Sequence, residues 1–331
     1  MDQRASRTGP RASRQGLIYG IAAYTLWGVF PLYFKLFDGI DPLEVLAHRI
    51  VWSFVLLALI VTVAGRWREL LQTLRRPRVL LTLAASTLLI GINWYTFLYS
   101  ISVGDVLQSS LGYFITPLMS VLLGVVLLGE RLRGGQLVAL GLALAGVLYL
   151  AFSAGVFPWI ALTLSVTFSL YGLARKLVAA DALLGLLVET MLLAPVSALY
   201  LASVHSQGPG AINTHGSGIA ALLFGSSIVT TVPLLLFAGS ARRLRLSTLG
   251  FLQYLAPSLQ FTCAVVVFGE AFSPEKMVAF GCIWAAVALY AVDSLYGYQR
   301  HPAAPASDEL PETEDLVAVE VPAATPCGCD G

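Results

Sequence analysis

Ten stretches of this chain are apolar over about 20 residues, which is the length that a helix needs to cross the hydrocarbon core of a bilayer. Of the 331 residues, 57% are hydrophobic and only 12% are charged, whereas soluble domains carry about 25% charged residues. A water-soluble fold of this size could not cover its surface with so few charges. The sequence therefore predicts an all-α integral membrane protein with ten transmembrane helices, at residues 17–37, 43–64, 79–99, 104–128, 134–152, 157–175, 182–203, 218–238, 247–269 and 275–296.

The two ends of the chain differ from this apolar body. Residues 1–16 form a basic arm rich in Arg, whereas residues 299–331 are rich in Pro, Ala and acidic residues and are expected to be disordered. The tail carries a C-x-C pair, Cys327 and Cys329, but two thiols alone rarely hold a metal ion. We therefore predict no metal site, and the role of this pair stays open.

The basic residues predict how the helices are oriented. With the amino terminus in the cytoplasm, the excess of Lys and Arg in cytoplasmic loops holds for the 20 basic residues apart from Lys35, Arg49 and Lys276. A shift of the helix count by one would destroy this bias. We therefore expect both termini to lie in the cytoplasm.

An internal repeat, in which position n matches position n + 140, divides the chain into two units. The stretch TPLMSVLLGVVLLGE (116–130) aligns with APSLQFTCAVVVFGE (256–270), so that Pro, Val-Val and Gly-Glu coincide. The units, residues 17–152 and 153–298, hold five helices each, and because five is odd the second unit must enter the membrane upside down. Inverted repeats are typical of secondary transporters, whose substrate site lies near the midplane between the repeats. We expect the Gly of each Gly-Glu pair to end a helix and the Glu to favour the positive start of the next one.

Several stretches together resemble a known family of carriers. They are YTLWGVFPLYFK, LAHRIVWS, NWYTFLY, SLGYFITPL, LLGERL, FSLYGLARK, VETMLLAP and LGFLQYLAP. The chain is similar to the EamA-type transporters of the drug/metabolite transporter superfamily, and these stretches look like its RarD branch. The resemblance covers residues 15–298. It implies the drug/metabolite transporter fold, a place in the bacterial inner membrane and export of small metabolites or drugs; some members are labelled as chloramphenicol-sensitivity proteins.

Two ionisable residues, His48 and Arg49, lie within the second apolar segment. At 1.5 Å per residue, Arg49 lies about 9 Å inside the membrane, and a charge at this depth usually faces a cavity or a partner. We predict that both line a substrate cavity, with Arg49 as an anchor for an anion or carboxylate and His48 as a titratable neighbour. The alternatives are an Arg that reaches the outer interface and a His that packs between helices.

Glu189 lies among leucines in the seventh segment and aligns with Arg49 under the shift of 140. The two side chains would lie about 12 Å apart along the membrane normal, so a direct salt bridge is not expected, although a shared water-filled cavity could couple them. In apolar surroundings a carboxyl group favours its protonated form, which suits a proton-coupling residue. The alternative is a protonated acid that is hydrogen-bonded between helices.

Aromatic and amide side chains are expected to line the same cavity. Aromatic walls with a few polar groups suit a flat or amphipathic organic substrate, whereas aromatic residues at segment ends more often belong to the interfacial belt. The cavity set consists of Trp27, Asn93, Trp94, Tyr113, Phe114, Tyr171, Gln253 and Tyr254.

Prolines within the segments predict kinks, which could serve as hinges or only as shape, because each removes a backbone donor. These prolines are Pro31, Pro117, Pro195, Pro233 and Pro257. We expect Pro117 and Pro257 to break their helices at mirrored depths.

Small residues at G-x3-A spacing predict close helix contacts. They occur at Gly141 and Ala145 and again at Gly281 and Ala285. Their segments, the fifth and the tenth, have the fewest polar residues. We expect these two helices at the periphery, where they could form a homodimer contact.

No enzyme or phosphate-binding motif is found: H-E-x-x-H, G-x-S-x-G, G-x-x-x-x-G-K-[ST] and G-x-G-x-x-G are all missing. We predict a secondary active transporter that exports a small organic metabolite or drug by alternating access. It needs no cofactor beyond a proton gradient as energy source, and its partners are membrane lipid and substrate rather than nucleic acid. The alternatives are a membrane enzyme acting on a lipid-linked substrate and a non-transporting sensor. Substrate, direction and coupling ion stay open.

Overall fold

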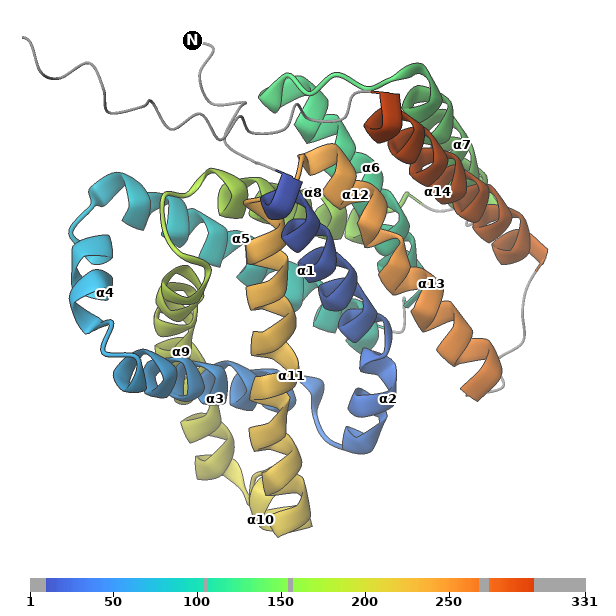
Figure 1. The fold of residues 1–331 in the computed structure, drawn as a ribbon. Helices are drawn as coiled ribbons and strands as arrows, with labels where there is room; N and C mark the ends of the chain where they lie inside the picture. The colour runs from blue at the N-terminus through green and yellow to red at the C-terminus, as the bar shows by residue number, and fades with distance from the viewer. Residues whose placement is uncertain (1–9, 104–105, 154–156, 268–273, 301–331) are drawn as a thin grey trace, which may run out of the picture.

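A computed structural model describes residues 10–103, 106–153, 157–267 and 274–300, and every regular element within them is helical (Figure 1). In chain order the elements are α1 (Pro10–Gly28), α2 (Phe30–Phe34), the 3-10 turn η1 (Lys35–Phe37), α3 (Pro42–Val63), α4 (Trp67–Leu74), α5 (Pro77–Ser102), α6 (Val106–Leu128), α7 (Gly134–Ser153), α8 (Trp159–Leu177), α9 (Ala182–Gln207), α10 (Ala211–His215), α11 (Ser217–Ala241), α12 (Leu246–Gln253), α13 (Leu255–Thr262), the π turn η2 (Cys263–Val267) and α14 (Pro274–Arg300). Helix α1 begins at Pro10 and so extends into the predicted basic arm. The predicted tail with Cys327 and Cys329 lies outside the described residues.

Nine segments in the described part of the chain are long and apolar enough to cross a membrane. They coincide with nine of the ten predicted segments, with α1, α2 and η1 forming the first and α12, α13 and η2 the ninth. The remaining segment is α8, which is more polar and buries Ser165, Thr167, Ser169 and Arg175. It packs against α5, α6 and α11, so neighbouring helices rather than lipid surround its polar positions.

Helix boundaries follow the same shift of 140 as the sequence. Adding 140 to the starts of α3, α5, α6 and α7 (42, 77, 106 and 134) gives the starts of α9, α11, α12 and α14 (182, 217, 246 and 274). The first segment ends at Phe37 and α8 ends at Leu177, which is the same spacing. The helices of the second predicted unit therefore repeat the spacing of those in the first.

Contacts between helices also occur in matched pairs. Helix α1 packs on α11 as α8 packs on α5, and α1 packs on α12 and α13 as α8 packs on α6. Likewise α3 contacts α11 as α9 contacts α5. The remaining large contacts, α3 with α9, α6 with α12 and α7 with α14, join a helix to its own counterpart. Exchange of the two units therefore leaves the packing pattern unchanged, as expected for a pseudo-twofold relation.

The prolines interrupt the helices only in part. Pro31 follows the break between α1 and α2, and Pro257 follows the break between α12 and α13. In contrast, α6 runs without interruption across Pro117, as α9 and α11 do across Pro195 and Pro233. The prediction of mirrored breaks at Pro117 and Pro257 is therefore wrong, because the missing backbone donor at Pro117 is tolerated inside a continuous helix.

Within one copy of the chain, the predicted small-residue contacts are not made, and the homodimer contact of these helices stays a prediction. A side chain added to Gly141 or Gly281 would meet no atom within 4 Å, and Ala145 and Ala285 are exposed as well. Helices α7 and α14 do lie side by side at one edge of the molecule (Figure 1). They meet through another face, where a Cβ on Gly146 would lie 3.0 Å from Cys282 Cβ and 3.1 Å from the carbonyl oxygen of Ala279.

Candidate functional site

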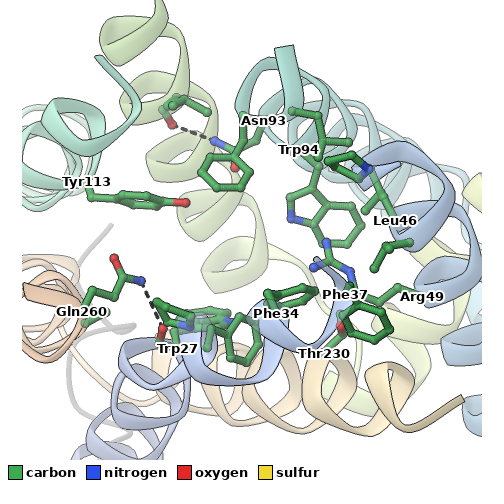
Figure 2. Close-up of a pocket in the computed structure, with 18 of the residues that line it drawn as sticks. Trp27, Phe34, Phe37, Leu46, Arg49, Asn93, Trp94, Tyr113, Thr230 and Gln260 are labelled. Atoms are coloured by element: carbon green, nitrogen blue, oxygen red, sulfur yellow. Dashed lines mark hydrogen bonds between the residues drawn. The ribbon is translucent and has the colours of Figure 1, made fainter. Parts of the chain in front are cut away.

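A cavity of about 660 Å³ lies between helices of both units. Side chains from α1, α2, α3, α5 and α6 form one part of its wall, and side chains from α8, α11, α12 and α13 form the rest. Most are aromatic or aliphatic, and Figure 2 shows Trp27, Phe34, Trp94 and Tyr113 around the hollow. At one end the lining includes the exposed loop residues Asp38 and Gly39, and we call this the open end.

Part of the predicted cavity set lines this space. The lining residues from that set are Trp27, Arg49, Asn93, Trp94, Tyr113 and Gln253, together with Pro31 and Pro257. They come from several different helices, so the fold brings together residues that lie more than 200 positions apart in the sequence.

Arg49 is the charged group on the inner wall of the cavity. Its guanidinium carbon lies 4.9 Å from the centroid of the Trp94 ring and 5.5 Å from that of Phe34, and Figure 2 shows it against Trp94. Within the part of the chain that the structure describes, Arg49 forms no ion pair, and its buried Nε has no hydrogen-bond partner. Stacking on aromatic rings offsets part of the cost of placing this charge here.

The cavity amides hold helices together. Asn93 Nδ2 donates to the carbonyl oxygen of Leu164 at 2.9 Å and to Thr167 Oγ1 at 3.0 Å, which ties α5 to α8. Gln253 Oε1 accepts from Ser120 Oγ at 3.1 Å. Gln260, which the sequence did not single out, donates from Nε2 to the carbonyl oxygen of Trp27 at 3.1 Å (Figure 2).

Four residues of the predicted set, His48, Phe114, Tyr171 and Tyr254, are not part of the lining. Three of them directly neighbour a lining residue in the sequence, and adjacent helix residues point about 100° apart. His48 is therefore turned to Glu44, with Nε2 3.9 Å from Oε1, while Phe114 packs on Phe280 of α14. Tyr254 packs beside Phe251.

Tyr171, the fourth of these residues, lies in an aromatic layer next to the cavity. The rings of Tyr171 and Phe237 stack with centroids 5.8 Å apart, and Tyr24 and Phe168 contact the same Phe237 ring. Tyr24 and Phe168 also line the cavity. Packed aromatic side chains therefore form its floor.

Glu189 lies behind this floor and does not reach the cavity. Its carboxylate accepts from Ser86 Oγ at 2.5 Å, from Tyr171 Oη at 3.3 Å and from Arg175 Nη1 at 3.3 Å. Only 2% of the Glu189 side chain and 1% of the Arg175 side chain are exposed. Glu189 therefore does not share this cavity with Arg49, which is the arrangement that the sequence left open.

The sequence does not single out Arg175, because a basic residue at the end of a segment is typical of the charges in cytoplasmic loops. It lies in the last turn of α8, and its Nη2 also donates to the carbonyl oxygen of Ala182 at 3.0 Å. A side chain at Gly185 would overlap the guanidinium. A glycine one turn before Glu189 was the available sequence signal, since it makes room for a large partner.

Further contacts join the helices at the end of the bundle that contains Arg175, Glu130 and Arg66, which we call the basic end. Glu130 accepts from the backbone N–H groups of Leu246 and Ser247 at 2.6 and 2.9 Å. It therefore caps α12 of the other unit and not α7, the next helix in the chain, as the sequence suggested. Gly129 does end α6 as predicted, with a φ of 64°. Arg66 pairs with Asp181 at 3.0 Å.

Comparison with known proteins identifies the family. Residues 14–152 match the EamA-like transporter family. The chain is 43% identical over 290 residues to Protein RarD of Salmonella typhi, which covers 88% of this chain and 99% of that protein. The chain belongs to the EamA family. As a RarD homologue it is a multi-pass membrane transporter and not an enzyme.

Other relatives agree with this assignment. An uncharacterized transporter of Bacillus subtilis, YojE, is 40% identical over 84% of this chain and 94% of its own length. The chloramphenicol-sensitive protein RarD of Pseudomonas aeruginosa is 33% identical over 86% of this chain and 96% of its own. A solved crystal structure matches with a TM-score of 0.63 at 20% identity, covering 86% of this chain and 98% of that one, which supports the EamA fold.

Within the described residues, no group of three or more His, Cys, Asp or Glu side chains could hold a metal ion.

Proposed function

We propose that this EamA transporter carries a small organic molecule by alternating access between two inverted five-helix repeats. The observation that supports this most directly is the cavity, which both units line and which extends to the surface at the open end. In this proposal α8 is the tenth crossing, shielded from lipid by α5, α6 and α11. The basic end faces the cytoplasm, since cytoplasmic loops are enriched in Arg and Lys, and the open end faces outward.

The inverted relation is supported by the recurrence of helix starts and contacts under the shift of 140. An odd number of crossings per unit reverses the direction of the second copy. The two copies then differ in state. In the first copy the helix ends that surround the cavity at the open end lie apart, whereas in the second copy the equivalent helix ends, at the basic end, are packed together. Transport exchanges these two states.

Three layers hold the basic end shut. The aromatic floor lies next to the cavity, the Arg175–Glu189 pair lies behind it, and the Glu130 carboxylate joins the α6–α7 loop to α12. Opening this end must move α8 and α9 relative to each other as well as to the surrounding helices, and so disturb the buried pair of opposite charges that joins them. Such a pair is expensive to break unless one charge is neutralised.

Glu189 is therefore our candidate for proton coupling. A proton taken up by Glu189 would release Arg175 and make opening easier, so inward proton flow could drive the substrate outward. The Glu189→Gln variant should retain substrate exchange in proteoliposomes but lose its response to a pH gradient. Glu69→Gln removes an exposed carboxyl at the same end and serves as the control; an unchanged pH response in Glu189→Gln would contradict the coupling role.

Counterflow in proteoliposomes tests the transport function itself. The purified protein would be assayed with a panel of amphenicols, amino acids and aromatic acids, with saturable exchange as the expected result. Leu46 points into the cavity (Figure 2), so Leu46→Trp should block exchange. Leu59 lies on the same helix but is 58% exposed on the outside, and Leu59→Trp should exchange normally. Equal activity of the two variants would argue against this cavity as the route.

A further inference from the structure

Lys35 and Arg49, two cations of the cavity lining, occupy the positions that Arg175 and Glu189 occupy in the other unit. The shift of 140 relates Lys35 to Arg175 and Arg49 to Glu189 without a gap. The alignment is anchored between them by Asp41 and Asp181, which stand directly before α3 and α9. At the basic end, which is the closed end of the cavity, a cation therefore faces an anion, whereas the open end has two cations.

At the closed end a carboxylate lies at the centre of the contact. The Glu189 carboxylate is held by Arg175 from α8 and by Ser86 from α5. The counterpart of Ser86 under the same shift is Ser226 on α11, which is also fully buried. The open end thus repeats the cation and the serine, but places a second cation where the carboxylate would be.

Closure of the open end by the same movement would bring Lys35 and Arg49 together. Like charges at ion-pair distance in a medium of low dielectric repel strongly. The third charged side chain of the lining, Asp38, lies in the loop before α3, and its counterpart in the closed end is the neutral Val178. The three charges leave the lining with a net positive charge of one, and Arg49 Nε has no partner among the described residues.

We propose that the cavity binds an organic carboxylate with a flat apolar body, and that this anion allows the open end to close by lying between Lys35 and Arg49. The substrate carboxylate takes the place that Glu189 fills at the basic end, while Trp94, Phe34 and Trp27 contact the apolar body. The volume of about 660 Å³ is in the range of small-molecule sites. This inference rests on the proposed alternating-access function.

The first test measures binding. The probe is 2-naphthoate, with its neutral isostere 2-naphthamide as the comparison, and the readout is the thermal unfolding midpoint of the purified protein. We expect naphthoate to raise the midpoint and naphthamide to leave it unchanged. Arg49→Gln should weaken naphthoate binding roughly 10- to 100-fold, the range for loss of one hydrogen bond to a charged group, and Arg49→Lys should recover part of it. Arg68→Gln removes an exposed cation outside the cavity and should have no effect.

The second test measures closure without any ligand. Leu46→Cys, in a background with the native cysteines changed to Ser, reports access from the open end through its labelling by an impermeant maleimide. Arg49→Glu places at position 49 the carboxylate that Glu189 provides in the other unit, so we expect labelling at least fivefold slower than in the parent. Adding Lys35→Glu restores like charges and should restore fast labelling. The parent should label more slowly in naphthoate but not in naphthamide.

The outcomes separate the inference from the function beneath it. Equal binding of naphthoate and naphthamide, or fast labelling in Arg49→Glu, would overturn the anion site. Counterflow of a neutral or cationic compound in the same preparation would then leave the carrier function standing. Selective naphthoate binding with slow labelling in Arg49→Glu, but no counterflow of any compound, would support the anion site and reject transport.

Discussion

The buried Arg175–Glu189 pair gives the sharpest prediction about stability. Each side chain is almost fully buried, at 1% and 2% exposure, so loss of one partner leaves the other charged and unpaired. We expect Glu189→Leu to lower the free energy of unfolding by about 3–5 kcal/mol, the usual result of breaking a buried pair. Glu189→Gln retains an acceptor for Ser86 Oγ and Tyr171 Oη, so its effect should be smaller, about 1.5–3 kcal/mol.

Removing both charges should behave differently. The double variant Arg175→Met with Glu189→Leu fills a similar volume and leaves no buried charge, and such replacements are often neutral or even stabilising. Its stability should therefore lie close to that of the parent. The two single substitutions should then be far from additive, with a coupling energy of at least about 2 kcal/mol.

Reversible unfolding in mixed micelles with increasing sodium dodecyl sulfate measures these free energies, and the six Trp residues report the transition by fluorescence. The same double variant also tests mechanism, because it should fold well and still lack a pH-driven response. Single variants that each cost less than about 1 kcal/mol, with an additive double variant, would refute the description of a tightly paired, desolvated site.

Three further predictions concern other parts of the fold. Glu130→Gln weakens two charge-assisted bonds to the first turn of α12 by about 2 kcal/mol in total, so hydrogen exchange there should accelerate roughly 30-fold. Gly250→Ala places a Cβ 2.8 Å from a backbone carbonyl of α6 and should cost about 1–3 kcal/mol, whereas Gly281→Ala meets no atom and should be neutral or slightly stabilising in the same unfolding assay. The hydrogen bond from Arg66 lowers the pKa of Glu69 below its ordinary 4.5. The small stabilisation from this pair is therefore present above pH 4.5 and is lost as the pH falls through the lowered pKa. The Arg66→Gln variant should return the pKa of Glu69, measured by NMR titration of its carboxyl carbon, toward 4.5.

The sequence predicted the helical segments and the repeat because both depend on composition and spacing. About twenty apolar residues in a row have few alternatives to a membrane helix, and the shift of 140 survives in the helix starts themselves. The sequence could also place Arg49 at a depth where a charge must face a polar or aromatic group, and in the structure Arg49 lies against Trp94.

Side-chain direction was the information that the sequence lacked. In helices that are apolar on nearly all sides, no polar face shows which way a residue points, so His48 and Phe114 were grouped with neighbours that face elsewhere. Partners across the bundle were equally hidden. Glu189 and Arg175 lie close in the chain, but only the packing of α8 on its neighbours turns the guanidinium inward. The G-x3-A motifs meet no helix within the chain for the same reason, since spacing does not say which face meets a partner.

The way in which the cavity amides are used bears on what the transporter can tell apart. Asn93 and Gln260 direct their N–H groups to backbone carbonyls of other helices, and Gln253 accepts from a serine. These bonds are made within the protein, so the amides contribute little to recognising a particular pattern of hydroxyl or amine groups on a ligand. Walls that distinguish molecules mainly by apolar contact separate close analogues by only about 1–3 kcal/mol. Such a cavity should accept a range of related compounds, and a search for its physiological cargo should expect a chemical series in place of one molecule.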